Sequence, residues 1–173
     1  MRKVRLRRRF DLVIAPFNVL LHLYDHGDVE AFLACVKAHL LPRGRFVFDI
    51  SLPRADDLNR DPERKYRVPR IRHPSTGQVV RYSERFEYDP LRQLLLVTME
   101  FEPPSGRAFC VPLTHRQFFP RELAALLHYN GFGDVTYTAD FNDLPPDACT
   151  DSLVVTCRSK AGKSRLAGRA RRV

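Results

Sequence analysis

The sequence predicts an α/β fold into which an antiparallel meander is inserted, and three observations support this prediction. Two short apolar runs flank a segment with helical periodicity. A central stretch then alternates apolar and polar residues between turn sequences. A second helical segment follows, and two further strand-like segments come after it. The chain has 173 residues, which is enough for one domain with a buried core.

The first part predicts a parallel strand–helix–strand unit. The apolar run Phe10–Ala15 is typical of a strand that is buried on both faces. We expect a helix that has Asp28 as its N-cap and is stopped by Pro42–Gly44. Helical spacing relates the apolar residues of this segment, which are Val29, Phe32, Leu33, Val36 and Leu40. Residues Arg45–Ile50 then predict a second buried strand, and the crossover between the strands should be right-handed.

The middle of the chain predicts antiparallel strands. Val79–Tyr88 and Gln93–Glu102 both alternate, and the turn sequence Asp89–Arg92 separates them. A second turn at Pro103–Gly106 leads to a strand near Arg107–Leu113. Tyr66–Arg72 adds an earlier strand to this meander.

The last part predicts a helix and two strands. Pro120 lies in the first turn of the helix, and Gly131 follows its end. Leu123, Leu126 and Leu127 should face inward. The strands are expected near Asp134–Asp140 and Ser152–Cys157.

The formal charge of +9 comes from the two ends of the chain. Residues 1–9 hold six basic residues and residues 158–173 hold seven, whereas residues 10–157 hold 16 basic and 20 acidic residues. The body is therefore mildly acidic, which argues against specific nucleic-acid recognition by it. No apolar run approaches the roughly 20 residues of a membrane span. Without a signal-peptide pattern, we expect a cytoplasmic protein with reduced cysteines, and with Cys35 and Cys157 buried.

Three local sequences, in this order, resemble the second half of a class I S-adenosylmethionine-dependent methyltransferase. FDLVIAPFNVLLHL (10–23) resembles the fourth strand and its loop, and HLLPRGRFVFDI (39–50) resembles the turn and fifth strand, with Arg43 in place of a glycine. HRQFFPRELAALLHYNGF (115–132) resembles the helix before the last two strands. The resemblance implies an incomplete Rossmann-like sheet with strands four to seven. We expect a partial domain at 1–158 with an insert at 65–113, followed by a basic disordered tail at 159–173.

The resemblance leaves one part of the family pattern unmatched. Family members bind the cofactor through a glycine-rich turn after the first strand, but the GxG sequence at Gly131–Gly133 follows a helix instead. Met1–Arg2 resembles a stretch that precedes the fourth strand in relatives. We therefore expect a truncated form or a fragment. Phe10–Ala15 would then be an exposed edge strand, which favours self-association or pairing with a complementing segment.

The resemblance places cofactor-binding residues in the loop after the first strand. These are Ala15, Pro16, Phe17 and Asn18, at the strand end where open α/β sheets bind ligands. His22 is a candidate general base because its ordinary pKa lies near 6.5. A purely structural loop, in which Phe17 packs inside and His22 bonds to a backbone carbonyl, is the alternative.

The candidate acceptor-binding residues are spread over the chain: Tyr24, Asp49, Tyr82, His115 and Arg116. Asp49 lies at the end of the second strand, at the ligand edge, with helix capping as the alternative. Arg116 could hold a carboxylate or phosphate, or form a surface ion pair instead. Tyr82 could line a pocket or simply pack on the meander. No metal site is predicted.

The sequence thus favours methyl transfer from S-adenosylmethionine to a small-molecule acceptor. A non-catalytic remnant of the fold, which serves as a binding module, is the first alternative. A basic nucleic-acid-binding protein is the second, and it depends on the charged ends alone. No membrane association is expected.

Overall fold

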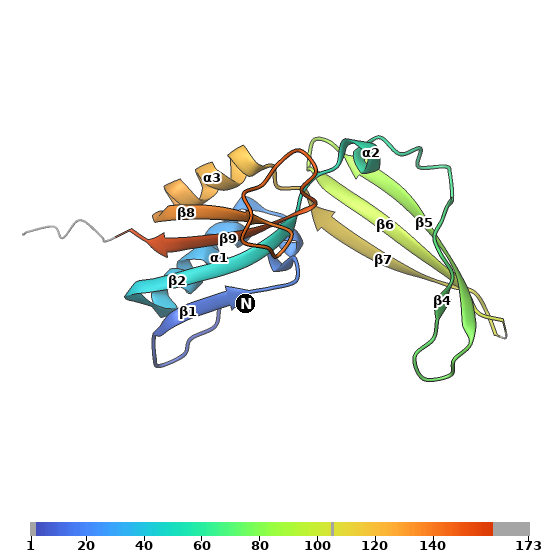
Figure 1. The fold of residues 1–173 in the computed structure, drawn as a ribbon, viewed down its shortest axis with the longest axis horizontal. Helices are drawn as coiled ribbons and strands as arrows, with labels where there is room; N and C mark the ends of the chain where they lie inside the picture. Colours follow the sequence, from blue (N-terminus) through green and yellow to red (C-terminus); the bar gives the residue numbers. More distant parts are fainter. Residues whose placement is uncertain (1–2, 105, 161–173) are drawn as a thin grey trace, which may run out of the picture.

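The computed structural model describes residues 3–104 and 106–160, and their strands form two sheets (Figure 1). The first sheet has the order β1-β2-β9-β8. β1 and β2 are parallel, and the other two pairs are antiparallel. The bounds of these strands are β1 Phe10–Ala15, β2 Leu40–Ser51, β8 Phe132–Ala139 and β9 Ser152–Ser159. The fold is therefore the predicted one, a partial Rossmann-like sheet that carries an antiparallel insert.

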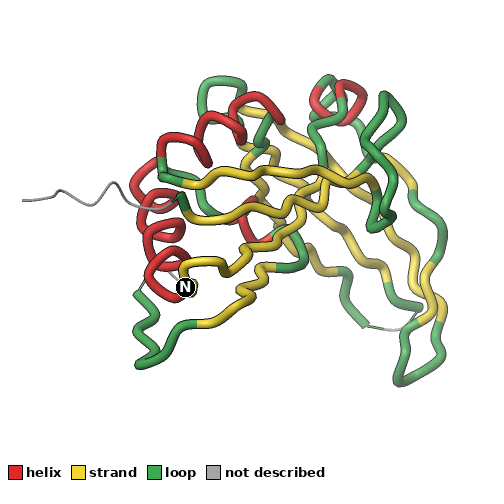
Figure 2. Tube along the Cα trace, turned by 60° about the vertical axis from the view of Figure 1, so that its left-hand side comes forward, coloured by secondary structure: helices red, strands yellow, loops and turns green. Residues whose placement is uncertain are grey.

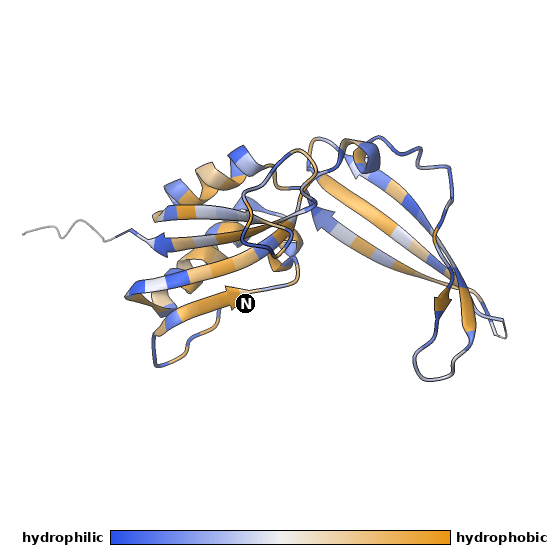
Figure 3. Cartoon of the chain, in the orientation of Figure 1, coloured by the Kyte–Doolittle hydropathy of each residue, from blue (hydrophilic) through white to orange (hydrophobic). Residues whose placement is uncertain are grey.

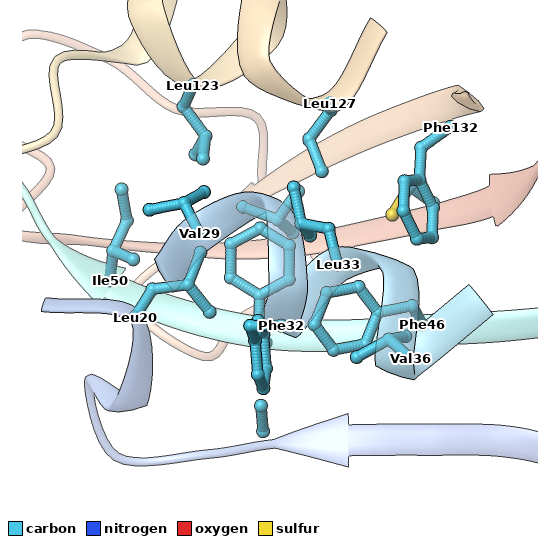
Figure 4. Packing of buried hydrophobic residues seen from close by; sticks show 14 of the residues in the cluster. Leu20, Val29, Phe32, Leu33, Val36, Phe46, Ile50, Leu123, Leu127 and Phe132 are labelled. Atoms are coloured by element: carbon cyan, nitrogen blue, oxygen red, sulfur yellow. The ribbon is translucent and has the colours of Figure 1, made fainter. Parts of the chain in front are cut away.

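Two helices cover one face of this sheet (Figure 2). They are α1, which spans His26–His39, and α3, which spans Pro120–Tyr129. The short 3₁₀ helix η1, Val19–His22, lies between β1 and α1. Side chains from both helices meet the inward face of β2 and β9 (Figure 4). Phe46, which is fully buried, stacks on Phe48 with ring centroids 4.8 Å apart and also contacts Phe32 and Phe132.

The opposite face of the sheet is partly open at β1. Successive residues of a strand point to opposite faces, so Leu12 and Ile14 lie on the face away from the helices. Their exposed fractions are 48% and 61%, respectively, so the prediction that this strand is buried on both faces is wrong. Among the described residues β1 pairs with β2 alone, so no described strand covers its other edge.

The second sheet is the insert, and it contains β3 to β7 (Figure 1). β5, β6 and β7 form an antiparallel meander, which β3 and β4 extend along the outer edge of β5. The bounds are α2 Ala55–Leu58, β3 Tyr66–Arg67, β4 Ile71–Arg72, β5 Val79–Asp89, β6 Leu94–Glu102 and β7 Phe109–Arg116. Figure 3 shows apolar positions along β6, in the middle of this sheet.

The structure corrects the predicted bounds of the first helix. α1 begins at His26, so Asp28 lies in its first turn and Asp25 takes the N-cap position. The helix ends at His39, because Leu40 already has extended dihedral angles. Pro42–Gly44 therefore does not stop the helix and lies within β2. The register between β1 and β2 shifts there, from the pair Phe10–Leu40 to the pair Leu12–Arg45.

The remaining elements agree more closely with the sequence prediction. Gly131 follows α3 with a φ of 80°, as expected for the residue after a helix end. All four cysteines are free. Cys157 is buried, and burial raises the pKa of its thiol to about 12. Cys35 is only half-buried, contrary to the prediction, and its Sγ donates to the Val4 carbonyl.

Parts of the predicted organisation fall outside the described residues. The turn at Pro103–Gly106 includes Ser105, which is not described, and the expected disordered tail is described only through Lys160. Ser159, which the prediction assigned to the tail, belongs to β9. No helix in the described ranges is both long and apolar enough to span a membrane.

Candidate functional site

The carboxyl ends of β1 and β2 lie side by side because the two strands are parallel, and Ala15 pairs with Phe48. The loop after β1 therefore reaches the end of β2. Phe17 N donates to Asp49 Oδ1 at 2.6 Å, and Asn18 N donates to Asp49 Oδ2 at 3.0 Å. Asp49 is 6% exposed, so these amides satisfy a carboxylate that has little contact with water.

A second pair of hydrogen bonds fixes the side chain of Asn18. Its Nδ2 donates to Ser51 Oγ at 3.0 Å, and its Oδ1 accepts from Ser51 N at 2.6 Å. The loop and the end of β2 are thus joined by four hydrogen bonds. Ser51 lies two residues after Asp49 at the end of β2, so its location at this edge could be predicted from the sequence.

The backbone of this loop has an unusual conformation. Phe17 and Asn18 have φ values of 68° and 58°. Asparagine tolerates the left-handed region, whereas a bulky side chain such as phenylalanine rarely adopts it. Such strain persists only where surrounding contacts hold it, and here Asp49 supplies them. The ring of Phe17 is 91% exposed, so it does not pack inside as the structural alternative required.

The end of β7 lies against η1 and brings two histidines together. The rings of His22 and His115 are 5.0 Å apart and lie at 68° to each other. Burial, together with the nearby His22, lowers the pKa of His115. A histidine with a lowered pKa is mainly uncharged near neutral pH, and it is a weaker base than an ordinary histidine. Tyr24 is close by, because its hydroxyl donates to the Thr114 carbonyl at 3.1 Å.

Arg116 faces away from the histidines and joins β7 to α3. Its Nη2 donates to Glu122 Oε1 at 2.7 Å, and its guanidinium lies 4.5 Å from the ring centre of Phe118. Arg116 is 4% exposed, and its Nε and Nη1 have no partner among the described residues. A hollow of about 240 Å³ beside it is also lined by Tyr24 and Glu122. The sequence prediction missed Glu122, although its place in the first turn of a helix after a proline was visible.

Tyr82 is the predicted site residue that lies apart from the others. It pairs with Phe101, whereas His115 pairs with Leu95, six residues earlier on β6. At about 3.4 Å per residue, the two positions are separated by about 20 Å along the same sheet face. Burial raises the pKa of Tyr82 to about 12, and the hydrogen bond to Glu84 and the negative charge of Glu84 add to this shift. In the described part of the chain, no three His, Cys, Asp or Glu side chains gather as metal ligands would.

Solved structures share the fold of this chain, although no family model and no curated relative matches the sequence. A S-adenosylmethionine-dependent methyltransferase from Clostridium acetobutylicum is 14% identical, with a TM-score of 0.75. The CcbJ methyltransferase from Streptomyces caelestis is 23% identical, also with a TM-score of 0.75. Each match covers 92% of this chain. The chain has a methyltransferase fold.

The match extends over only part of those methyltransferases. This chain spans 62% of the Clostridium structure and 61% of CcbJ. CalS10, an amino pentose methyltransferase from Micromonospora echinaspora that was solved with S-adenosylmethionine, is 19% identical with a TM-score of 0.68. That match covers 91% of this chain and 62% of CalS10.

Proposed function

We propose that this chain is part of a S-adenosylmethionine-dependent methyltransferase that acts on a small-molecule acceptor. The observation that supports the proposal most directly is the strained Phe17–Asn18 loop, which Asp49 holds at the carboxyl edge of a methyltransferase-like sheet. Ligands bind at this edge in open α/β sheets. The amides of Phe17 and Asn18 already bond to Asp49. The loop would therefore contact the cofactor through the exposed ring of Phe17 and through the surface of its backbone. Asp49 is then a positioning residue.

The chemistry fits the residues around the loop. The bound cofactor supplies a methyl group on a sulfonium, which passes in line to a nucleophilic N, O or C atom of the acceptor as the C–S bond breaks. His22 would take the proton that this nucleophile loses. His115 beside it stays neutral at neutral pH, because burial and His22 lower its pKa. Positioning supplies most of the rate in such a transfer.

Cofactor binding by the chain itself is tested by an NMR titration with S-adenosylmethionine. The chain offers one side of a cofactor site, so we expect weak binding with a Kd of about 1 mM, worth about 4 kcal/mol. The backbone amide signals of Ala15, Phe17, Asn18 and His22 should shift. Shifts confined to other regions would contradict the proposed site. A folded chain that shows no shift would support the non-catalytic remnant instead.

A pair of matched variants tests the positioning role of Asp49. Asp49→Asn removes the negative charge that accepts hydrogen bonds from the amides of Phe17 and Asn18, so it should abolish the cofactor-induced shifts. Asp151→Asn makes the same chemical change at an exposed residue near this edge, where Asp151 pairs with Arg54, and should leave the shifts intact. If both variants bind the cofactor like the parent chain, Asp49 has no positioning role.

We further propose that the free edge of β1 binds a complementing segment or a second copy of this chain. The support is the exposure of Leu12 and Ile14 beside an edge of β1 that pairs with no other described strand. Analytical ultracentrifugation of the chain should show association, and Ile14→Lys should reduce it. Asp134→Lys on the other edge strand, β8, is the control. A strictly monomeric parent chain would argue against self-association through β1.

A further inference from the structure

The outer part of the insert holds a basic hollow that the proposed methyl-transfer site does not use. It has a volume of about 520 Å³ and lies where β3, the segment between β3 and β4, and the start of β5 meet the end of β6. Arginine side chains from three places line it: Arg67, Arg70 and Arg81. Its volume falls within the usual range of small-molecule sites, about 300 to 1,000 Å³.

The three arginines are not neutralised by neighbouring side chains. Within the described residues, Arg67, Arg70 and Arg81 form no hydrogen bond through their side chains and no ion pair. The one carboxylate among the lining residues is Glu102, which lies opposite Arg81 in the strand ladder. Lys65 also lines the hollow, but its charge is bound to Glu100. The hollow therefore has an excess of positive charge.

This excess contrasts with the rest of the body. Residues 65–113 hold eight basic and five acidic residues, a balance of +3. The remainder of residues 10–157 holds eight basic and fifteen acidic residues, a balance of −7. Positive charge is thus concentrated on the insert, and three unpaired arginines share one concave surface there.

The hollow is separate from the histidine pair. Arg81 and His115 point to opposite faces of the insert sheet, because Arg81 pairs with Glu102 whereas His115 pairs with Leu95, an odd number of residues away. The two positions also lie at opposite ends of the strands. A ligand in the hollow would therefore occupy a second site, distinct from the one proposed for methyl transfer.

We propose that this hollow binds the phosphoryl group of a small molecule. Guanidinium groups match tetrahedral oxyanions well, since each offers several donors in a fixed plane. Three of them on one concave surface suit a group with two or more negative charges better than a single carboxylate. Ser83, which also lines the hollow, adds a hydroxyl that can donate to a phosphate oxygen.

Inorganic pyrophosphate is the probe that tests this site, with sodium chloride at the same ionic strength as the reference. We expect saturable binding in calorimetry, and shifts of arginine Nε signals in NMR spectra. Arg81→Gln should weaken binding about tenfold, which corresponds to about 1.4 kcal/mol. Arg121→Gln, which removes the same charge from an exposed position on α3, should leave binding unchanged. The basic ends of the chain are the same in all variants, so they add a constant background.

Several results would overturn the proposal. Equal weakening by Arg81→Gln and Arg121→Gln would show a general effect of charge, and no weakening by Arg81→Gln would exclude the hollow. Acetate should bind at least tenfold more weakly than pyrophosphate, so equal affinity would contradict a phosphoryl site. Tighter binding of an oligoglutamate peptide would indicate an acidic protein as the partner. Arg81 is exposed, so its variant should fold, and circular dichroism checks this.

Discussion

The two sheets of this protein are stabilised in different ways. The first packs against α1 and α3 over one continuous apolar core, in which Phe46 is completely buried. No described residue of the insert belongs to that core cluster. Instead, the insert has a few buried apolar side chains, the aromatic stack Tyr82–Phe101–Phe109, and a carboxylate, Glu100, held by Lys65 and Arg85. The comparison indicates that the core of the first sheet stabilises the fold, whereas most of the insert lies at the protein surface.

The largest expected effect separates the two regions directly. Phe46→Ala should lower the free energy of unfolding by about 4 kcal/mol, because it removes a ring that contacts three others and leaves a cavity. Phe101→Ala, in the half-exposed stack of the insert, should cost only about 1 to 2 kcal/mol. Urea unfolding measures both. Equal losses would show that the insert has a core of comparable quality.

The next effect concerns the joint between the two regions, which is the ion pair of Arg116 on β7 with Glu122 on α3. Arg116→Met should cost about 2 kcal/mol, because the change leaves the Glu122 carboxylate without its buried cation. Replacement of both Arg116 and Glu122 by methionine should lower the free energy of unfolding by less than Arg116→Met alone. Arg121→Met on the exposed side of α3 is the control and should stay within about 0.5 kcal/mol of the parent. If Arg116→Met matches that control, the pair does not stabilise the joint.

A smaller effect belongs to the ion cluster of the insert. Hydrogen bonds from Lys65 and Arg85 lower the pKa of Glu100 below its ordinary value of 4.5. Their contribution is therefore present above pH 4.5 and is lost as the pH falls toward the lowered pKa. Glu100→Gln should cost about 1 kcal/mol at pH 7, since both cations are about half-exposed. Urea midpoints of parent and variant should converge in acid, and a constant difference would contradict this.

The smallest effect concerns the histidines between the two regions. His115 should titrate below 6.5 in NMR spectra, because burial and His22 lower its pKa. His22→Ala should raise this pKa only in part, since burial is the larger cause. Because the folded pKa is depressed, the contribution of His115 to stability is present above pH 6.5 and is lost as the pH falls toward the lowered pKa. An ordinary pKa for His115 would mean that β7 does not pack against η1 in solution.

Sequence patterns predicted the strands of both sheets better than the site. The apolar run Phe10–Ala15 and the alternation in Val79–Tyr88 are local patterns, so both strands could be placed. The hydrogen bonds from Phe17 and Asn18 to Asp49 join residues more than 30 positions apart, which no local period encodes. The sequence could identify Asp49 as lying at the ligand edge. Only the structure shows that both carboxylate oxygens of Asp49 accept hydrogen bonds from the protein itself.

The same limit explains the other differences. Tyr82 and His115 share a sheet face, but their separation depends on the register of β6, which alternation alone does not set. The sequence predicts the start of α1 three residues late, because Asp25 and Asp28 are both suitable N-caps. Arg116 was identified as a candidate, but its turn toward Glu122 depends on how α3 packs.

The irregular stretch at the start of β2 has a consequence for how this chain can change in evolution. Between Leu40 and Arg45 the strand makes an excursion, while its partner β1 advances by only two residues. Gly44 approaches the Phe10 carbonyl so closely that a Cβ would lie 2.8 Å from it, which fixes the end of the excursion. Insertions or deletions within Leu41–Arg43 can therefore be absorbed before the register is set. The same change after Arg45 would turn Phe46 and Phe48 out of the core, so length variation among homologues should be confined to this excursion.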